Sequence, residues 1–287
     1  MTLSVAAWAG GRARPVMAAK AAALALKLLA QLADFRQYLK QDVSSLPQRG
    51  RPPRVVARAV EACRLVAGAG GVRLTPLAAV AGAVADEVAL AAWGLGADKV
   101  VVNNGGDLAL CLAPGRRLSV GLPLFPGGPL GHRLTVKGGD GVGGVASSGW
   151  PGRSFSPGVA EQVAVWGRDG ALADAAATCL AGACTVDSPA VTRVPAGELD
   201  PQTDVPEMMV TTRVGELSQD EVLRALAGGE ALARRLLPAL PLMGAHFSVA
   251  GHKLLIARQE GGRLQTRRAS PPSGMARLPT SSGSTPG

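Results

Sequence analysis

The chain has 287 residues, a length compatible with one large domain or two small ones. Apolar residues make up 47% of the chain and aromatic residues only 3%, so the core must consist mainly of Ala, Val and Leu. The net charge of +9 lies at the two ends, because residues 1–60 hold ten basic and two acidic side chains and residues 266–287 hold three basic and no acidic ones. With a nearly neutral middle, no interleaved aromatic residues and no zinc-finger spacing, the sequence argues against nucleic-acid binding.

The four cysteines show no C-x-x-C spacing, which argues against a zinc site or a dithiol redox motif. They are Cys63, Cys111, Cys179 and Cys184. The sequence therefore predicts reduced, buried thiols in a cytoplasmic protein. The apolar stretch 21–26 is followed by Lys27 and is too short to span a bilayer, so neither a membrane segment nor a targeting signal is expected.

The first third of the chain has the spacing of helices. Residues 1–14 show no periodic pattern and predict a frayed start or a remnant strand. Apolar residues three or four apart predict a helix over 17–41, which the proline-rich loop 47–53 ends. A second helix is expected over 54–67, and the Ala/Val-rich stretch 76–93 predicts a buried helix.

From about residue 98 the pattern changes to short β runs separated by glycine and proline turns. A glycine-dense loop is expected over 137–154, and Ala171 to Cys184 predict an apolar helix. Strands are expected over 100–102, 108–112, 118–121, 132–136, 162–166, 208–213, 245–250 and 253–257.

Near the C-terminus, Ser218 and Glu221 form a capping-box pattern that predicts the start of an amphipathic helix over 218–236. The composition of residues 266–287 predicts a disordered basic tail, and no internal repeat is apparent. The order of helices and strands indicates an α+β fold, with mixed or antiparallel sheets packed with helices around a ligand cleft. We predict one domain over 1–265, with N-terminal helices over about 17–67 and a core over about 70–257.

The stretch "NNGGD" at 103–107 interrupts two apolar strands. Asn-Gly is a strong hairpin signal, so one interpretation is a turn and nothing more. The alternative is a ligand site, in which Asn104, Gly105 and Gly106 let a ligand approach the backbone and Asp107 accepts a hydrogen bond from it.

A second stretch, "VASSGW", also combines glycine with small polar residues. Ser147, Ser148 and Gly149 could expose several N–H groups to a phosphate, with Trp150 beside them and Arg153 adding positive charge. The alternative interpretation is a flexible glycine-rich connection.

In the third stretch, "LADAAATC", Asp174 and Thr178 lie four residues apart in an otherwise apolar helix. Side chains at this spacing share one helix face. A buried carboxylate is costly without a partner, and a divalent cation would offset that cost with the threonine hydroxyl as a second oxygen ligand. Alternatively, Asp174 lies in the first turn and interacts favourably with the helix dipole.

Together, "NNGGD", "VASSGW…RSFS" and "LADAAATCLAGACTVDSPA" resemble the ApbE-like superfamily, which includes FAD:protein FMN transferases, and most of all an uncharacterised bacterial and archaeal branch of it. The resemblance spans roughly residues 20–257. It implies an α+β fold in which a flavin nucleotide, FAD or FMN, lies in a cleft beside Mg²⁺. The matching metal ligands are the side chains of Asp174 and Thr178 and a backbone carbonyl for which Ala78 is the nearest match.

Two departures from the transferases bear on activity. The segment "SFSPGVAEQ" replaces their H-x-x-D-P-x-x-G pattern, and Ala81 stands at the place of their lysine. The first hypothesis is a metal-assisted protein that binds a flavin or another phosphate-bearing nucleotide, with transferase or hydrolase chemistry on a pyrophosphate. The alternatives are a non-catalytic flavin- or metabolite-binding module and an interaction scaffold with a vestigial site. A homo-oligomer is left open.

Overall fold

The computed structural model describes residues 2–47, 50–152, 154–259 and 262–270. Its centre is a nine-stranded sheet with the order β13-β12-β11-β8-β7-β4-β3-β1-β2, in which every neighbouring pair is antiparallel. These strands are β1 (Leu3–Ala9), β2 (Arg12–Ala13), β3 (Lys99–Asn104), β4 (Asp107–Leu112), β7 (Gly144–Ser148), β8 (Gln162–Gly167), β11 (Leu242–Val249), β12 (His252–Arg258) and β13 (Leu264–Ala269). Two separate hairpins are formed by β5 (Arg117–Pro123) with β6 (Leu130–Lys137) and by β9 (Val191–Pro195) with β10 (Met209–Val214).

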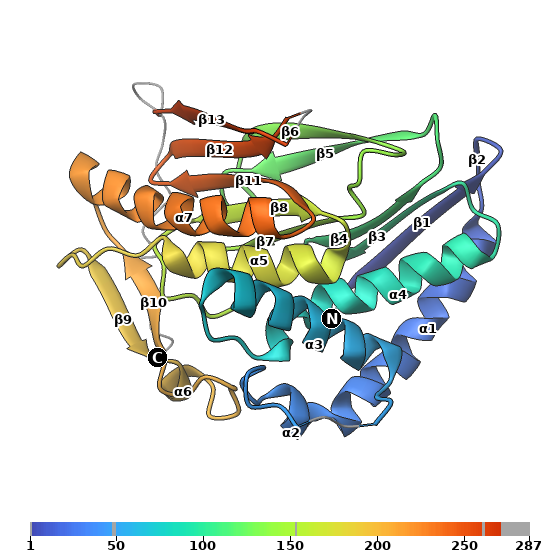
Figure 1. The fold of residues 1–287 in the computed structure, drawn as a ribbon, viewed down its shortest axis with the longest axis horizontal. Helices are drawn as coiled ribbons and strands as arrows, with labels where there is room; N and C mark the ends of the chain where they lie inside the picture. Colours follow the sequence, from blue (N-terminus) through green and yellow to red (C-terminus); the bar gives the residue numbers. More distant parts are fainter. Residues whose placement is uncertain (1, 48–49, 153, 260–261, 271–287) are drawn as a thin grey trace, which may run out of the picture.

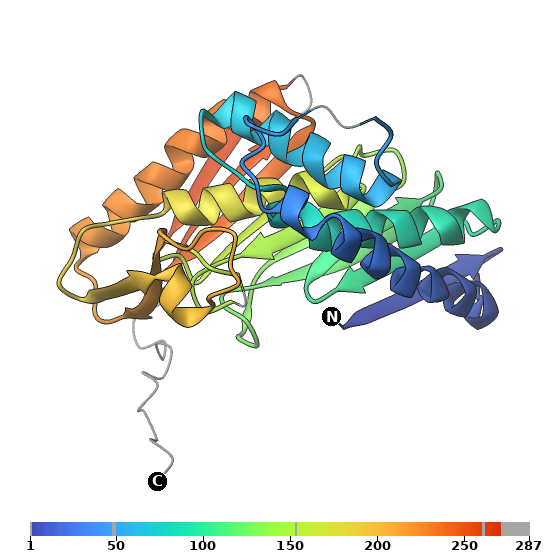
Figure 2. The ribbon, with the colours of Figure 1, turned by 90° about the horizontal axis from the view of Figure 1, so that it is seen from below.

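The helices α4, α5 and α7 lie along one face of the large sheet, α1 contacts both β1 and α4, and α3 packs against the outer side of the helices (Figures 1 and 2). The helices are α1 (Pro15–Asp34), α2 (Arg36–Leu39), α3 (Arg54–Gly70), the 3-10 helix η1 (Pro76–Ala79), α4 (Val80–Gly94), α5 (Gly170–Ala183), α6 (Ala196–Leu199) and α7 (Gln219–Ala239). The α+β architecture predicted from the sequence is confirmed.

Successive side chains of a strand point to opposite faces of the sheet, so part of the apolar core lies on each face. Val163 and Val165 of β8 face the helices and belong to the larger core cluster, whereas Ala164 and Trp166 face the opposite side. There they pack with apolar residues of the β5–β6 hairpin, such as Val120. The hairpin therefore covers part of the face that the helices leave free.

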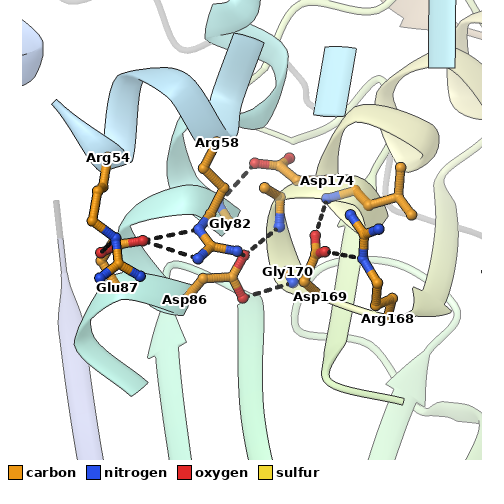
Figure 3. A network of polar contacts seen from close by, with 11 residues as sticks. Arg54, Arg58, Gly82, Asp86, Glu87, Arg168, Asp169, Gly170 and Asp174 are labelled. Carbon is orange, nitrogen blue, oxygen red and sulfur yellow. Dashed lines mark hydrogen bonds and ion pairs between the residues drawn. The ribbon is translucent and has the colours of Figure 1, made fainter. Parts of the chain in front are cut away.

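Helices α4 and α5 begin at a point of close backbone contact. A Cβ atom on Gly82 would lie 2.2 Å from the carbonyl oxygen of Gly170, so no side chain fits between the two helix starts. Each helix also holds the N-terminus of the other through a carboxylate (Figure 3). Asp86 of α4 accepts hydrogen bonds from the N–H groups of Gly170 (2.8 Å) and Ala171 (3.0 Å), and Asp174 of α5 accepts one from Gly82 (2.9 Å).

The two carboxylates belong to a short repeat in the sequence. Residues 82–86 read GAVAD and residues 170–174 read GALAD. In both segments the glycine makes the close contact, and the aspartate one turn later reaches the other helix start.

Residues 3–9 form strand β1, which pairs with β3 from Leu3 to Trp8, so the strand is the one of the two expected alternatives that is present. Two expectations from the sequence were wrong. Residues 144–148 of the expected glycine-dense loop form β7, whose Gly144 allows close approach of the α5 start. Residues 266–269 of the expected tail belong to β13, which pairs with β12, and residues 271–287 lie outside the described residues.

Two helical segments in the described ranges are long and apolar enough to cross a membrane by length and composition alone. They are α1, with a mean hydropathy of 1.6, and the segment Pro76–Gly94, with a mean hydropathy of 1.4. The stretch 21–26 is part of the 20-residue α1, as its interpretation as one face of a helix predicted. Core helices and N-terminal signal sequences pass the same test, so this is weak evidence for a membrane span.

The contact between α4 and α5 can be tested by adding a single methyl group. Gly82→Ala should lower the free energy of unfolding by about 2–3 kcal/mol, because the methyl group must push the two helix starts apart. Gly68→Ala in α3 is the matched control, since no atom lies within 4 Å of its added Cβ, and it should stabilise the chain by about 0.5–1 kcal/mol. Denaturant unfolding of both variants measures the difference, and equal stabilities would contradict the assigned role of the contact.

Candidate functional site

A cleft with a volume of ≈ 850 Å³ lies where the β3–β4 turn, the end of β7, the start of α4 and the β5–β6 hairpin meet. This volume is in the range of small-molecule and cofactor sites. Its lining is apolar on the helix and hairpin sides, where Val80, Val84 and Leu122 contribute, and polar along the turn and β7. The first two stretches singled out in the sequence therefore border the same cleft.

The β3–β4 turn presents bare backbone to the cleft. Gly105 and Gly106 have φ angles of +70° and +115°, which residues with a side chain rarely adopt, and both line the cleft. Asn104 also lines it, but its amide donates a hydrogen bond to the carbonyl oxygen of Ala81 at 3.0 Å. The predicted hairpin is confirmed, and Asn104 ties it to the α4 start.

Asp107 connects the first stretch to the second. One of its carboxylate oxygens accepts a hydrogen bond from the N–H of Ser147 at 3.3 Å. Ser147, Ser148 and Gly149 all line the cleft, although the serines belong to strand β7 and do not form the loop that the sequence predicted. Ser147 and Ser148 therefore offer hydroxyl groups from a strand.

Two polar atoms next to this wall have no partner in the described part of the chain. They are the Oγ of Ser148 and the Nε1 of Trp150, both buried. Such atoms are costly unless a ligand or water meets them. Arg153, expected to add positive charge here, lies outside the described residues.

The third stretch lies directly behind the cleft. The carboxylate of Asp174 accepts a hydrogen bond from the N–H of Gly82, and the preceding residue, Ala81, lines the cleft. Burial raises the pKa of Asp174 well above its ordinary value, and the nearby carboxylate of Asp107 raises it further, while the N–H of Gly82 lowers it. Thr178 is half-buried one turn further along α5. Asp174 therefore neither faces open solvent nor lies far from the glycine-containing turn.

The donor set is compatible with a hard cation such as Mg²⁺. In the described ranges no group of three or more His, Cys, Asp or Glu side chains is placed to hold a metal ion. Mg²⁺, however, is usually bound by one or two carboxylates, with the phosphates of a ligand and water completing its shell. Asp174 can supply such a carboxylate, because Gly82 donates a hydrogen bond to only one of its two oxygens. Ala78 lies half-buried in η1, and in the sequence it stands between Leu77 and Val80, which line the cleft.

Sequence reasoning missed two carboxylates. Asp86 is buried, and its burial, followed by the charge of Asp169, raises its pKa to about 7. It stabilises the helix start through Gly170 and forms an ion pair with Arg58 at 3.8 Å (Figure 3). The signal in the sequence was the GAVAD–GALAD repeat.

The second missed carboxylate is Glu161, which lines the cleft. Burial raises its pKa to about 7, and a hydrogen bond from the N–H of Ala250 opposes the shift. Ala250 has a φ of +47°, a conformation that costs energy for a residue with a side chain. In the sequence, Glu161 is the one acidic residue in the apolar segment 156–167, which could have marked it.

These features define an α+β protein with a nucleotide-sized cleft whose helix side is backed by a half-buried carboxylate, that of Asp174. The family described as AbpE bacteria matches residues 1–255, so the chain belongs to this family, and its resemblance to the ApbE-like superfamily is confirmed. A UPF0280 protein of Methanopyrus kandleri is 32% identical over 225 residues, covering 76% of this chain and 90% of that protein. A UPF0280 protein of Methanothrix thermoacetophila is 38% identical over 143 residues, covering 50% of this chain and 57% of that protein.

Two solved structures are similar to the chain at low identity. The flavinyl transferase ApbE of Pseudomonas stutzeri has a TM-score of 0.47 and 14% identity, covering 93% of this chain and 90% of that chain. The flavin transferase ApbE of Vibrio cholerae has a TM-score of 0.42 and 12% identity, covering 94% of this chain and 97% of that chain.

The raised pKa of Glu161 predicts a pH-dependent stability. Because its pKa rises from an ordinary 4.5 to about 7 on folding, the folded chain holds this proton more tightly. Its stabilising contribution is complete below the lower value and is lost as the pH rises through the higher one. The melting temperature of the wild type should therefore fall more steeply from about pH 5 to about pH 8 than that of Glu161→Gln.

The control for this measurement is Glu198→Gln, which removes an exposed carboxylate from α6. It should follow the wild-type profile. Parallel profiles for the wild type and Glu161→Gln would show that the protonation of Glu161 is not linked to folding.

Proposed function

We propose that the cleft binds a flavin nucleotide, or another nucleotide that carries a diphosphate, together with a divalent cation such as Mg²⁺. The observation that carries this proposal is the proximity of two carboxylates, Asp107 and Asp174, behind a turn of bare glycine backbone. Two carboxylates and a diphosphate would repel one another without a cation between them.

The electrostatic cost at Asp174 supports the cation. A buried carboxylate beside a second one holds its negative charge only at a free-energy cost, which appears as its raised pKa. A divalent cation changes the sign of the local charge and stabilises both carboxylates. Asp174 and Thr178 would hold it, with the carbonyl of Ala78 as a further oxygen. When bound, the cation would neutralise the charge of the diphosphate and polarise a phosphoryl oxygen.

The walls of the cleft suit the two parts of such a ligand. Gly105 and Gly106 let phosphate oxygens approach the backbone, and Ser147 and Ser148 supply hydroxyl groups. An apolar ring system such as a flavin can pack against the aliphatic side of the cleft. This side consists of Leu77, Val80, Val84, Val120 and Leu122. The membership in an ApbE-like family makes FAD the first ligand to test.

A binding-only role is the second candidate. It is favoured by Ala81 and by the segment 154–162, which lack the lysine and the histidine of the transferases that the chain resembles. Covalent FMN transfer to another protein is therefore not part of the proposal.

The metal role can be tested through the coupling between FAD and Mg²⁺. In the wild type, Mg²⁺ should tighten FAD binding about tenfold or more, equivalent to a coupling free energy of at least about 1.4 kcal/mol. Asp174→Asn should remove this coupling, because the amide cannot replace the carboxylate as a cation ligand. Flavin fluorescence titrations with Mg²⁺ or with a chelator measure the two affinities.

Asp220→Asn, which alters an exposed carboxylate in the first turn of α7, is the matched control and should couple like the wild type. The proposal would be refuted if Mg²⁺ left FAD binding by the wild type unchanged, or if Asp174→Asn kept the full coupling. Melting temperatures of both variants show whether the asparagine substitution preserves the fold.

A further inference from the structure

Two histidines meet between the β5–β6 hairpin and the large sheet. His132 of β6 and His246 of β11 stack, with their ring centroids 5.8 Å apart and their planes inclined by 16°. Near this pair the hairpin lies close to β12 and β13, at the outer end of the sheet (Figure 1). Neither histidine lines the cleft described above. The pair therefore belongs to a separate polar cluster.

The strand pairing places two more basic side chains on the same face of the sheet. Residues opposite each other in paired strands share a face, and so do residues two positions apart in one strand. His246 pairs with Leu255 of β12, which pairs with Arg267 of β13. Lys253 lies two positions before Leu255 on β12. Arg267 and Lys253 therefore lie on the face of His246, whereas His252 lies on the opposite face.

The hairpin brings His132 to this face from its other side. His132 pairs with Leu122 in the hairpin, and Leu122 packs in the apolar cluster between the hairpin and the sheet. His132 therefore faces the sheet as Leu122 does. A Cβ atom on Gly131 would lie 3.2 Å from the Cε1 of His246, so the imidazole of His246 has one edge against the hairpin.

The inner histidine has an unused polar atom. His246 is 2% exposed, and its Nδ1 has no hydrogen-bond partner in the described part of the chain. Such an atom is costly unless a ligand or water meets it. His132 and Lys253 are half-buried and Arg267 is exposed, so solvent reaches the edge of the cluster. A small ion can therefore approach a buried imidazole past three basic side chains.

The cluster carries positive charge without a balancing acid. Burial, followed by the charge of Arg267, lowers the pKa of His132. Burial, followed by the charges of His132 and Lys253, lowers the pKa of His246 to about 4. No carboxylate is among the causes of either shift, and no ion pair between described residues includes a member of the cluster. An anion is the missing counterpart.

The other charged residues of these strands point away from the cluster. Arg133 of β6 and Arg268 of β13 each directly follow a member of it, so their side chains alternate to the other face of their strand. Arg268 forms an ion pair there with Glu230 of α7. From β8, the strand partner of His246 is Ala164, which has no charge.

We propose that this basic cluster is a binding site for a phosphate group, either free in solution or carried by a small molecule. The cluster consists of His132, His246, Lys253 and Arg267. A phosphate group suits it because it has about two negative charges near neutral pH and three strong acceptor oxygens, whereas a carboxylate has one charge. The inference does not depend on the nucleotide or the cation proposed for the cleft.

Anion binding at this place is coupled to protonation of the two imidazoles. A neutral imidazole has one N–H donor and the imidazolium has two, and a nearby negative charge raises the pKa of a histidine. A bound anion therefore opposes the lowering of the pKa of His132 and His246. By linkage, the affinity for the anion rises as the pH falls and these groups take up protons. Arginine and lysine alone would give no such dependence near neutral pH.

The test uses the three histidines of the full-length chain, whose Cε1–H resonances can be followed separately by NMR. Sulfate is the first probe, because its charge stays the same throughout the titration. The resonances of His132 and His246 should move with one common dissociation constant, and that of His252 should stay in place. Sulfate should bind about tenfold more tightly at about pH 5 than at about pH 8.

Inorganic phosphate and glycerol phosphate are the second and third probes, and both should move the same two resonances. They distinguish the two sources of the phosphate group. A site for the free ion binds inorganic phosphate at least as tightly as the ester, whereas a site for a phosphorylated small molecule binds the ester more tightly.

Variants assign the binding to the cluster. Arg267→Gln should weaken sulfate binding about threefold or more, because it removes an exposed cation at the edge of the site. Arg213→Gln, which removes an exposed arginine from β10, is the matched control and should bind like the wild type. His246→Gln keeps a polar side chain that cannot take up a proton, so it should reduce both the affinity and its pH dependence.

Several results would overturn the proposal. One is that neither sulfate nor phosphate moves the resonances of His132 and His246, or that sodium chloride at the same ionic strength moves them equally. Another is that all three histidines respond alike, or that Arg213→Gln weakens binding as much as Arg267→Gln, because the overall positive charge would then be the cause. If His246→Gln fails to fold, as its melting curve would show, the exposed Arg267→Gln decides the question.

Discussion

The structure depends on one contact, the meeting of two helix starts at Gly82 and Gly170. Each start leaves backbone N–H groups without partners inside its own helix, and each has a partial positive charge. Asp86 and Asp174 supply the missing acceptors across the contact, each from one turn inside the other helix. The arrangement works only because glycine lets the two backbones approach within the space of a side chain. The same five-residue pattern therefore supplies both the glycine that lets the two helix starts approach and the aspartate that accepts the N–H groups of the other helix.

This contact also fixes the helix side of the cleft. Ala81 precedes the contact glycine, lines the cleft, and accepts the amide of Asn104 from the β3–β4 turn. The turn, the α4 start and the α5 carboxylate thus form one connected unit. Its free-energy cost is the burial of Asp86 and Asp174, whose raised pKa values show that the fold disfavours their charge. A ligand that brings a positive charge to this site would therefore lower the free-energy cost of these negative charges.

Sequence reasoning reached the features that are local. The Asn-Gly turn and the spacing of Asp174 and Thr178 can be read within a few residues, and both lie at the cleft or directly behind it. Strand β1 was left as one of two alternatives because its stability comes from pairing with β3, almost 100 positions away. Glu161 was missed because burial, not its neighbours in the chain, sets its chemistry. Asp86 was missed because its partners lie more than 80 positions further along.

Burial raises the pKa of both Asp174 and Glu161, but their neighbours give the two carboxylates different chemistry. Asp174 lies beside the carboxylate of Asp107, so a cation relieves both charges at once. Glu161 interacts with backbone N–H groups, those of Ala250 and of Glu161 itself, and no carboxylate is among the causes of its shift, so a proton is sufficient to neutralise it. Because the pKa of Asp174 is itself raised, a cation and a proton compete for that carboxylate. Two carboxylates at one cleft therefore have different neighbours and different charge partners.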